Sequence, residues 1–170
     1  VPLVARWPAV IEKGGVCDQT ICTADLMATC AEIIGYELED NEGEDSYSMI
    51  PFFFQEEMEG DFDEATVHHS LYEEFVIRHC EWKLILSPGS GGWSSQNSWD
   101  DESDDLLDVQ LYHLTLDPGV EHNLQAENSE IVEELKILFA SYYANRRSTP
   151  GDPQKNEPMN PEWHKHTFKP

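Results

Sequence analysis

The side chains best suited to chemistry in this sequence gather in one stretch. Two adjacent histidines, His68 and His69, precede Lys83, and a glycine-rich segment follows, Pro88-Gly89-Ser90-Gly91-Gly92-Trp93. Histidine changes its charge near neutral pH, and paired glycines let backbone N–H groups approach a ligand oxygen closely. An indole such as that of Trp93 can stack on a ring. None of these groups singles out a reaction by itself.

The familiar catalytic and nucleotide-binding loops are absent from the sequence. The glycine-rich segment lacks the first glycine of a nucleophile elbow, and Ser94 stands where a dinucleotide fingerprint has its third glycine. No Gly-Lys-Ser/Thr triplet of a phosphate-binding loop occurs. The acidic run 100–105 lacks the glycine and the spacing of an EF-hand, so we interpret it as a solvated loop rather than a calcium site.

The histidine pair has two interpretations. Adjacent side chains on a strand point to opposite faces, so His68 and His69 cannot hold one small ion together. One should face a covering helix and the other should face outward or into a cleft. The pair is therefore either a core histidine beside a surface one, or it includes a ligand-facing residue. Lys83, between Trp82 and Leu84, is interpreted as a surface lysine whose stem covers apolar area.

The elements that must position these residues form an antiparallel meander covered by a helix. Short segments rich in aromatic and β-branched residues predict strands at Ala65–Ser70, Phe75–His79, Glu81–Ser87 and Val109–Thr115. A helix is expected to start near 128–129. Its apolar stripe should cover one face of the meander, and it consists of Ile131, Val132, Leu135, Leu138, Phe139 and Tyr142.

The first part of the chain predicts different elements. The apolar run at residues 1–8 favours a strand buried in a sheet, and because little downstream resembles its partners, we expect a cut through a larger fold there. A helix should follow an N-cap at Thr23 and close at Gly35. An acidic connector, 37–45, then leads to a short helix within 46–53.

Composition excludes some partners. The formal net charge of −24 argues against nucleic acid and against docking to anionic membranes. No apolar run approaches the ~20 residues that span a bilayer. The four cysteines, Cys17, Cys22, Cys30 and Cys80, form no Cys-x-x-Cys pair. Small buried thiols are expected for those in the first helix region, and spacing assigns no disulfide.

A set of short motifs, in order along nearly the whole chain, resembles the C-terminal portion of type I sulfatases, arylsulfatase-like members of the alkaline-phosphatase-like superfamily. The segment at 23–29 resembles the family's Thr-Asp-Leu-x-x-Thr helix with one residue inserted, and His113 and Cys80 stand where Asp and a turn glycine are usual. The other matching segments are 1–8, 43–51, 67–70, 75–78, 82–85, 88–94, 110–114, 117–124 and 147–151.

The resemblance implies an α/β parent fold of which this chain is an α+β piece. Residues 1–62 would end the main domain with its last strand and flanking helices. Residues 63–147 would form a small C-terminal antiparallel subdomain with its packing helix, and 148–170 an extended tail. The family hydrolyses sulfate esters with a formylglycine made within Cys/Ser-x-Pro/Ala-x-Arg, beside a calcium ion. No segment of this chain matches that motif, so no catalytic or metal residue is assigned to it.

By resemblance, the chain is expected to support the fold of a secreted or periplasmic sulfuric ester hydrolase and to be inactive alone. Calcium and formylglycine are expected in a preceding part. The C-terminal subdomain lies beside the substrate cleft in the family, so contacts to a sulfate-ester substrate are expected from His68 or His69 and from Gly91, Gly92 and Trp93. Two other interpretations stay open: a stand-alone interaction module, and part of a phosphatase or phosphodiesterase on the same scaffold.

Overall fold

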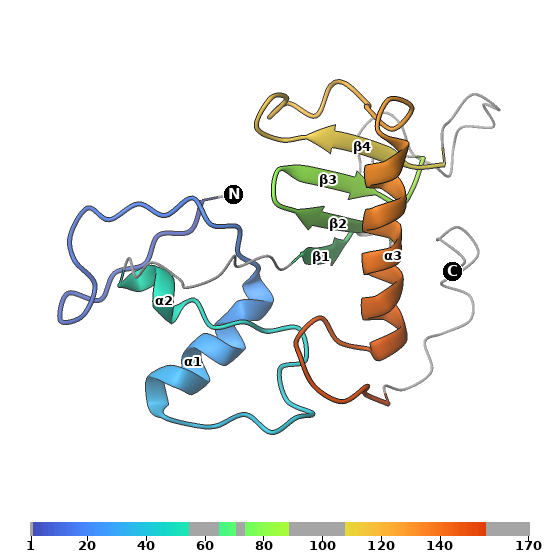
Figure 1. The fold of residues 1–170 in the computed structure, drawn as a ribbon. Coiled ribbons are helices and arrows are strands. Elements are labelled where there is room, and N and C mark those ends of the chain that lie inside the picture. The colour runs from blue at the N-terminus through green and yellow to red at the C-terminus, as the bar shows by residue number, and fades with distance from the viewer. Residues whose placement is uncertain (1, 55–64, 71–73, 89–107, 156–170) are drawn as a thin grey trace. The chain divides into compact units, whose positions relative to one another are not determined.

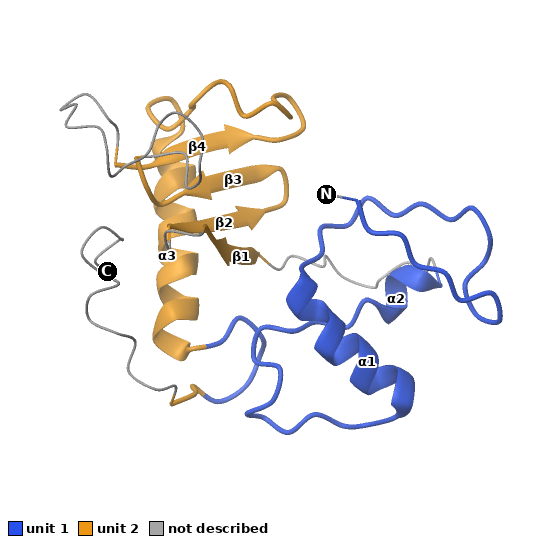
Figure 2. Ribbon diagram, turned by 180° about the vertical axis from the view of Figure 1, so that it is seen from behind, with its two compact units in different colours: residues 1–62, 147–152 blue, residues 63–146, 153–170 orange. Residues whose placement is uncertain are grey.

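The computed structural model describes residues 2–54, 65–70, 74–88 and 108–155 (Figure 1). The chain divides into two compact units (Figure 2). Unit 1 consists of residues 1–62 and 147–152, and unit 2 of residues 63–146 and 153–170. The sequence did not lead us to expect that 147–152 returns to the first unit.

Unit 2 is built on a four-stranded antiparallel sheet in the order β1-β2-β3-β4 (Figure 1). The strands are β1 (Thr66–His69), β2 (Phe75–His79), β3 (Trp82–Ile85) and β4 (Gln110–His113). Neighbours in the sheet are neighbours in the sequence, which is a meander. The predicted α+β class and antiparallel meander are confirmed; β2 has the predicted bounds, and the other three strands are shorter than predicted at both ends.

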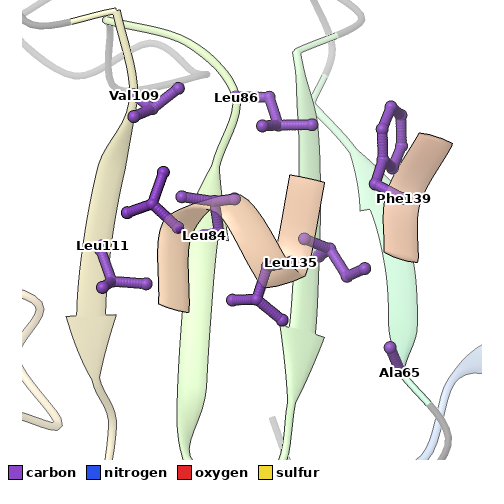
Figure 3. Packing of buried hydrophobic residues seen from close by; sticks show 9 residues of the cluster. Ala65, Leu84, Leu86, Val109, Leu111, Leu135 and Phe139 are labelled. Atoms are coloured by element: carbon purple, nitrogen blue, oxygen red, sulfur yellow. The ribbon is translucent and has the colours of Figure 1, made fainter. Parts of the chain in front are cut away.

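Helix α3 (Ser129–Asn145) crosses one face of this sheet (Figures 1 and 2). Its stripe at helical spacing buries Val132, Leu135 and Phe139, as predicted. The sheet contributes a row of directly paired residues, Val67, Ile77, Leu84 and Leu111. Figure 3 shows the labelled side chains of this core gathering between helix and strands; its buried members are Ala65, Ile77, Leu84, Leu86, Val109, Leu111, Val132, Leu135 and Phe139.

The turn between β2 and β3 carries a strained residue. His79 pairs with Trp82, so Cys80 and Glu81 form a two-residue connection. Cys80 adopts a φ of 50°. Left-handed backbone costs a side-chain-bearing residue about 1–2 kcal/mol, and glycine adopts it freely. The structure therefore explains why a cysteine in place of the usual turn glycine is unfavourable here.

The segment after β4 is fixed by two polar side chains. Asp117 Oδ2 accepts hydrogen bonds from the backbone N–H groups of Glu121 and His122, both at 2.8 Å. Asn123 Oδ1 accepts from Leu111 N at 3.0 Å and from Gln125 N at 3.1 Å, which ties the returning chain to β4. The two backbone hydrogen bonds that Asp117 accepts lower its pKa, and the bond from the His122 N–H is the largest cause.

Unit 1 contains the turn η1 (Thr23–Asp25), helix α1 (Leu26–Ile34) and helix α2 (Ile50–Phe53). Gly35 closes α1 with a left-handed φ of 71°, as predicted. Thr23 is not an N-cap: it is the first residue of η1, because that turn starts one residue after Cys22. The short helix predicted within 46–53 is present as α2.

Polar side chains of the 23–29 motif hold unit 1 together. The buried carboxylate of Asp25 accepts from Cys22 N at 2.6 Å and from Tyr47 N at 3.1 Å. The buried hydroxyl of Thr29 accepts from Met49 N at 2.9 Å. Ser46 Oγ accepts from Ala28 N at 2.8 Å. The motif thus fastens the segment before α2 to α1, which is a structural task.

The strand expected at residues 1–8 is not found. Residues 2–8 belong to no helix or strand, and Leu3 and Val4 expose 53% and 88% of their surface. A strand exists only when a neighbouring strand accepts and donates its ladder hydrogen bonds. The described residues of unit 1 include no strand that could do so, so residues 2–8 form no strand here, and the strand of a larger sheet expected at 1–8 stays a prediction.

The cysteine expectation also needs correction. Cys17, Cys30 and Cys80 are exposed, Cys22 is half-buried, and all are free thiols. Cys30 belongs to the apolar spacing of α1, yet α1 buries only Thr29 and Ala31. Hydrophobic spacing indicates a face that can be covered, and within the described residues of unit 1 nothing covers this one.

The segment that returns to unit 1 is anchored by Arg147, which exposes only 7% of its surface. Its guanidinium donates to Asp40 Oδ1 at 2.8 Å and to four backbone carbonyls, those of Asp40, Thr149, Pro150 and Asp152. It also donates to the Thr149 hydroxyl at 2.9 Å. The segment 147–151 of the resemblance is therefore an anchoring motif.

Candidate functional site

The two histidines of β1 lie on opposite faces of the sheet, as strand alternation predicts. His69 shares the helix-covered face with Val67, and its ring meets the ring of Phe75 edge-on at 6.0 Å. Phe75 in turn packs against Phe139 of α3 at 5.2 Å. His69 therefore belongs to the rim of the core, and His68 belongs to the face that α3 does not cover, which we call the second face.

The second face presents two rows of paired residues. One row consists of Thr66, Arg78, Lys83 and Tyr112, and the other of His68, Val76, Ile85 and Gln110. Arg78 and Lys83 are direct cross-strand partners, which places their Cβ atoms about 4.5–5.5 Å apart. We call His68, Arg78 and Lys83 the basic cluster.

Positive charges of neighbouring residues affect the titration of the basic cluster, and no acidic residue is among the causes that shift the pKa of His68 or Lys83. Burial lowers the pKa of Lys83, and the neighbouring Arg78 lowers it further. Burial is also the main cause that lowers the pKa of His68, followed by the charges of Lys83 and His69. More than a third of the His68 surface is nevertheless exposed, so the ring is accessible from solvent.

Polar groups border the basic cluster without neutralising it. The Tyr112 hydroxyl donates to Gln110 Oε1 at 2.8 Å, and Gln110 Nε2 donates to the Ser87 carbonyl at 2.9 Å. The buried carboxylate of Glu74 accepts from the Ser87 hydroxyl at 2.6 Å. Glu74 directly precedes β2, two residues before Val76, the partner of His68, but its charge is not among the causes that shift the pKa of His68 or Lys83.

The remaining predicted site residues cannot be placed. Gly91, Gly92 and Trp93 lie outside the described residues, as does the acidic run 100–105. Contacts of His68 or His69 with that segment therefore stay predictions.

Sequence reasoning missed Arg78 as a partner of Lys83. The signal was available in the two-residue connection Cys80-Glu81, because a connection of that length pairs the residues that flank it symmetrically. The orientation of the histidines was available too. Val67 is apolar, so the residue two positions later, His69, shares its core-facing side.

Metal binding finds no support in the parts of the chain that the structure describes. No group of three or more His, Cys, Asp or Glu side chains there is placed to hold a metal ion. The described residues thus do not fit the calcium ion that the resemblance implies for the parent enzyme, and no step through a metal is assigned to them. Among the same residues, no helix is long and apolar enough to cross a membrane.

Unit 1 contains an open hollow. Its acidic lining is engaged in structure: Glu42 accepts from the Tyr36 hydroxyl at 3.0 Å, and Asp45 accepts from Ser148 N at 2.8 Å. The hollow is lined by Thr23, Ala24, Met27, Asn41, Glu42, Gly43, Glu44, Asp45 and Ser46. None of the predicted site residues lies in it.

Comparison with known proteins places the fold. No family model and no curated protein sequence matches the chain. Among solved structures, it matches a 6S-sulfatase from a study of glycosaminoglycan metabolism by Bacteroides thetaiotaomicron, with 24% identity, a TM-score of 0.53 and coverage of 69% of this chain. It also matches a protein in complex with its substrate D-glucosamine-2-N,6-O-disulfate, with 19% identity, a TM-score of 0.60 and coverage of 86%.

The chain spans 24% and 29% of the lengths of these two proteins. At such identities the likeness concerns the fold. The predicted resemblance to part of a sulfatase is confirmed at that level.

Proposed function

We propose that this chain is the C-terminal part of a sulfatase, a hydrolase of sulfate esters. The observation that carries the proposal is the fold match over 86% of this chain to 29% of a protein solved with a sulfated glucosamine as its substrate. The sulfatase-like motifs, in their expected order along the sequence, support the same assignment.

The role of this part is to complete the fold and to contribute to the substrate cleft. Four of the motif residues, Asp25, Asp117, Asn123 and Arg147, form most of their described hydrogen bonds with backbone groups. Such residues build turns and anchors. The formylglycine nucleophile and the calcium ion are supplied, in this proposal, by a preceding part of the enzyme, where the metal stabilises charge on the sulfate.

The substrate is, in this proposal, a sulfate ester on a sugar. Support comes from the matching structure that contains its substrate, D-glucosamine-2-N,6-O-disulfate. A histidine of β1 contributes to the cleft, and His68 is the better placed of the two because His69 packs on Phe75. Secretion or export to the periplasm belongs to the same proposal and is supported by the family resemblance alone.

The test is to recover the open reading frame that contains this chain and to assay both forms. The purified chain should not hydrolyse an aryl sulfate or a sulfated glucosamine, with or without calcium. The complete protein, matured to carry formylglycine, should hydrolyse sulfate esters and lose activity when its modified residue becomes alanine.

Two outcomes would overturn the proposal. A preceding segment with a Ser or Thr nucleophile, together with hydrolysis of phosphate esters instead of sulfate esters, would assign the chain to a phosphatase or phosphodiesterase. A reading frame without any catalytic segment would leave a stand-alone interaction module.

A further inference from the structure

We propose that the basic cluster of His68, Arg78 and Lys83 on the second face of the sheet binds an anionic group of the substrate, a sulfate on a sugar that is not the one being cleaved. The identity of the ligand rests on the proposed function. The location of the site rests on the geometry of unit 2 alone.

The first argument is placement. Arg78 and Lys83 are fixed opposite each other by the β2–β3 register. His68 stands on β1 one row further along the strands, and the side chain of Lys83 is near enough to affect its charge. Three cationic or ionisable donors thus stand on one face of three neighbouring strands, and strands hold such groups more rigidly than loops do.

The second argument is that this arrangement is unfavourable without a ligand. Like charges directly opposite on a sheet destabilise it. Within the described residues, the side chain of Lys83 forms no ion pair or hydrogen bond, and the side chain of Arg78 makes a single hydrogen bond, from Nε to the Cys80 carbonyl at 3.3 Å. The chain carries 34 acidic residues against 10 basic ones, yet among the described residues no ion pair joins any of them to Arg78 or Lys83, and the nearby Glu74 accepts a hydrogen bond from the Ser87 hydroxyl at 2.6 Å.

The third argument is the chemistry of the donors. A guanidinium offers a planar fork that matches two oxygens of a sulfate, an ammonium adds a point charge, and an imidazole adds a hydrogen bond. Val76 and Ile85 lie in the same row as His68, next to the row of Arg78 and Lys83, and of these two apolar side chains only Ile85 is partly exposed toward a ligand. Because the net charge of −24 repels anions elsewhere, binding should be confined to this patch.

The experiment uses the whole 170-residue chain, labelled for NMR, with D-glucosamine-2-N,6-O-disulfate as the probe and neutral N-acetyl-D-glucosamine as its control. The sulfated sugar should shift the resonances of the His68 ring and the Lys83 side chain saturably, and raise the pKa of His68. The neutral sugar should do neither. Raising the ionic strength should weaken the binding.

Lys83→Met and Arg78→Gln should each weaken the affinity at least about tenfold, the loss expected for one charge-assisted contact. Lys136→Met is the matched control, because Lys136 lies on α3 and pairs with Glu133 at 3.2 Å. It removes the same charge and should leave the affinity within about twofold, a difference too small for a lost contact. Using two cluster variants keeps the test valid if one fails to fold.

Wild-type affinity in both cluster variants, or shifts spread over the surface without saturation, would overturn the inference. So would a complete enzyme in which a carboxylate from the preceding part pairs with Lys83. The two proposals fail separately. If the Lys83→Met variant of the complete enzyme cleaves sulfate esters as well as the unchanged enzyme does, the anion-binding site is refuted and the proposed function stands. If the basic cluster binds the sulfated sugar but the complete protein cleaves only phosphate esters, the proposed function is refuted and the anion-binding site stands.

Discussion

Replacing Arg147 by alanine should release the segment 147–152 from unit 1. The guanidinium is buried, and its donors are shared among Asp40 and carbonyls that precede and follow it in the sequence. Removing one partner of a buried ion pair costs about 3–5 kcal/mol. Asp40 keeps 53% of its side chain exposed and can regain water, so we expect the low end, about 3 kcal/mol.

The assay is amide hydrogen exchange on the whole chain. The N–H groups of Ser148 and Thr149 both donate to the Glu44 carbonyl, at 3.1 and 3.0 Å, so their exchange reports release of the segment. A loss of about 3 kcal/mol corresponds to roughly a 100-fold increase in opening, and these amides should exchange faster by about that factor. Amides in the middle of α3 should keep their rates.

Arg146→Ala is the matched control because it removes the same charge one residue earlier. The Arg146 side chain contacts only the Tyr143 ring among the contacts described for it, at 5.3 Å. Arg147→Lys should give exchange rates of the Ser148 and Thr149 amides between those of the unchanged chain and Arg147→Ala, since an ammonium keeps the charge but lacks the planar set of donors of a guanidinium. If Arg147→Ala leaves the exchange of Ser148 and Thr149 unchanged, or if Arg146→Ala accelerates it equally, the anchoring argument is wrong.

Cys80→Gly should raise the free energy of unfolding by about 0.5–1 kcal/mol, because glycine removes the cost of the left-handed turn, and Cys80→Ala should give no gain in the same denaturant titration. His113→Phe should stabilise the chain by about 1 kcal/mol in thermal unfolding: Nδ1 of His113 is buried and has no hydrogen-bond partner among the described residues, and phenylalanine keeps the ring contact with Trp82, whereas His113→Ala should destabilise it. The lowered pKa of His68 means that the unfolded chain binds more protons between that pKa and the ordinary value near 6.5, so stability should fall as the pH falls through this interval. Denaturant titrations at several pH values should show a shallower fall for His68→Gln, and an identical fall would exclude His68 as a source.

The elements of unit 2 could be predicted because their signals are local. Alternation in Phe75–His79 and the stripe Val132, Leu135 and Phe139 each depend on residues that are close in sequence. A meander joins neighbouring strands by short connections, so the order of the sheet followed as well. The strand expected at residues 1–8 does not depend on local signals alone. It is not formed here, because its partner strands would have to come from elsewhere.

Local sequence signals predict the pairing of the residues in the basic cluster but not their surroundings. Sequence established that His68 and His69 face opposite ways, and it already contained the connection length that pairs Arg78 with Lys83. It did not establish that Lys83 is half-buried or that no described acid neutralises it. Those properties depend on which of 34 acidic side chains come near, and proximity between distant residues is a property of the fold.

The sequence by itself therefore determined the alternation of strands, the covering helix and the left-handed close of α1 at Gly35, all set by spacing and backbone sterics within a few residues. Only the tertiary structure decided that Arg147 returns to bind Asp40 and that Asp25 holds Tyr47. Each of these contacts joins residues far apart in the chain. Their polar groups have many possible partners, and burial selects the one arrangement in which the hydrogen bonds are satisfied.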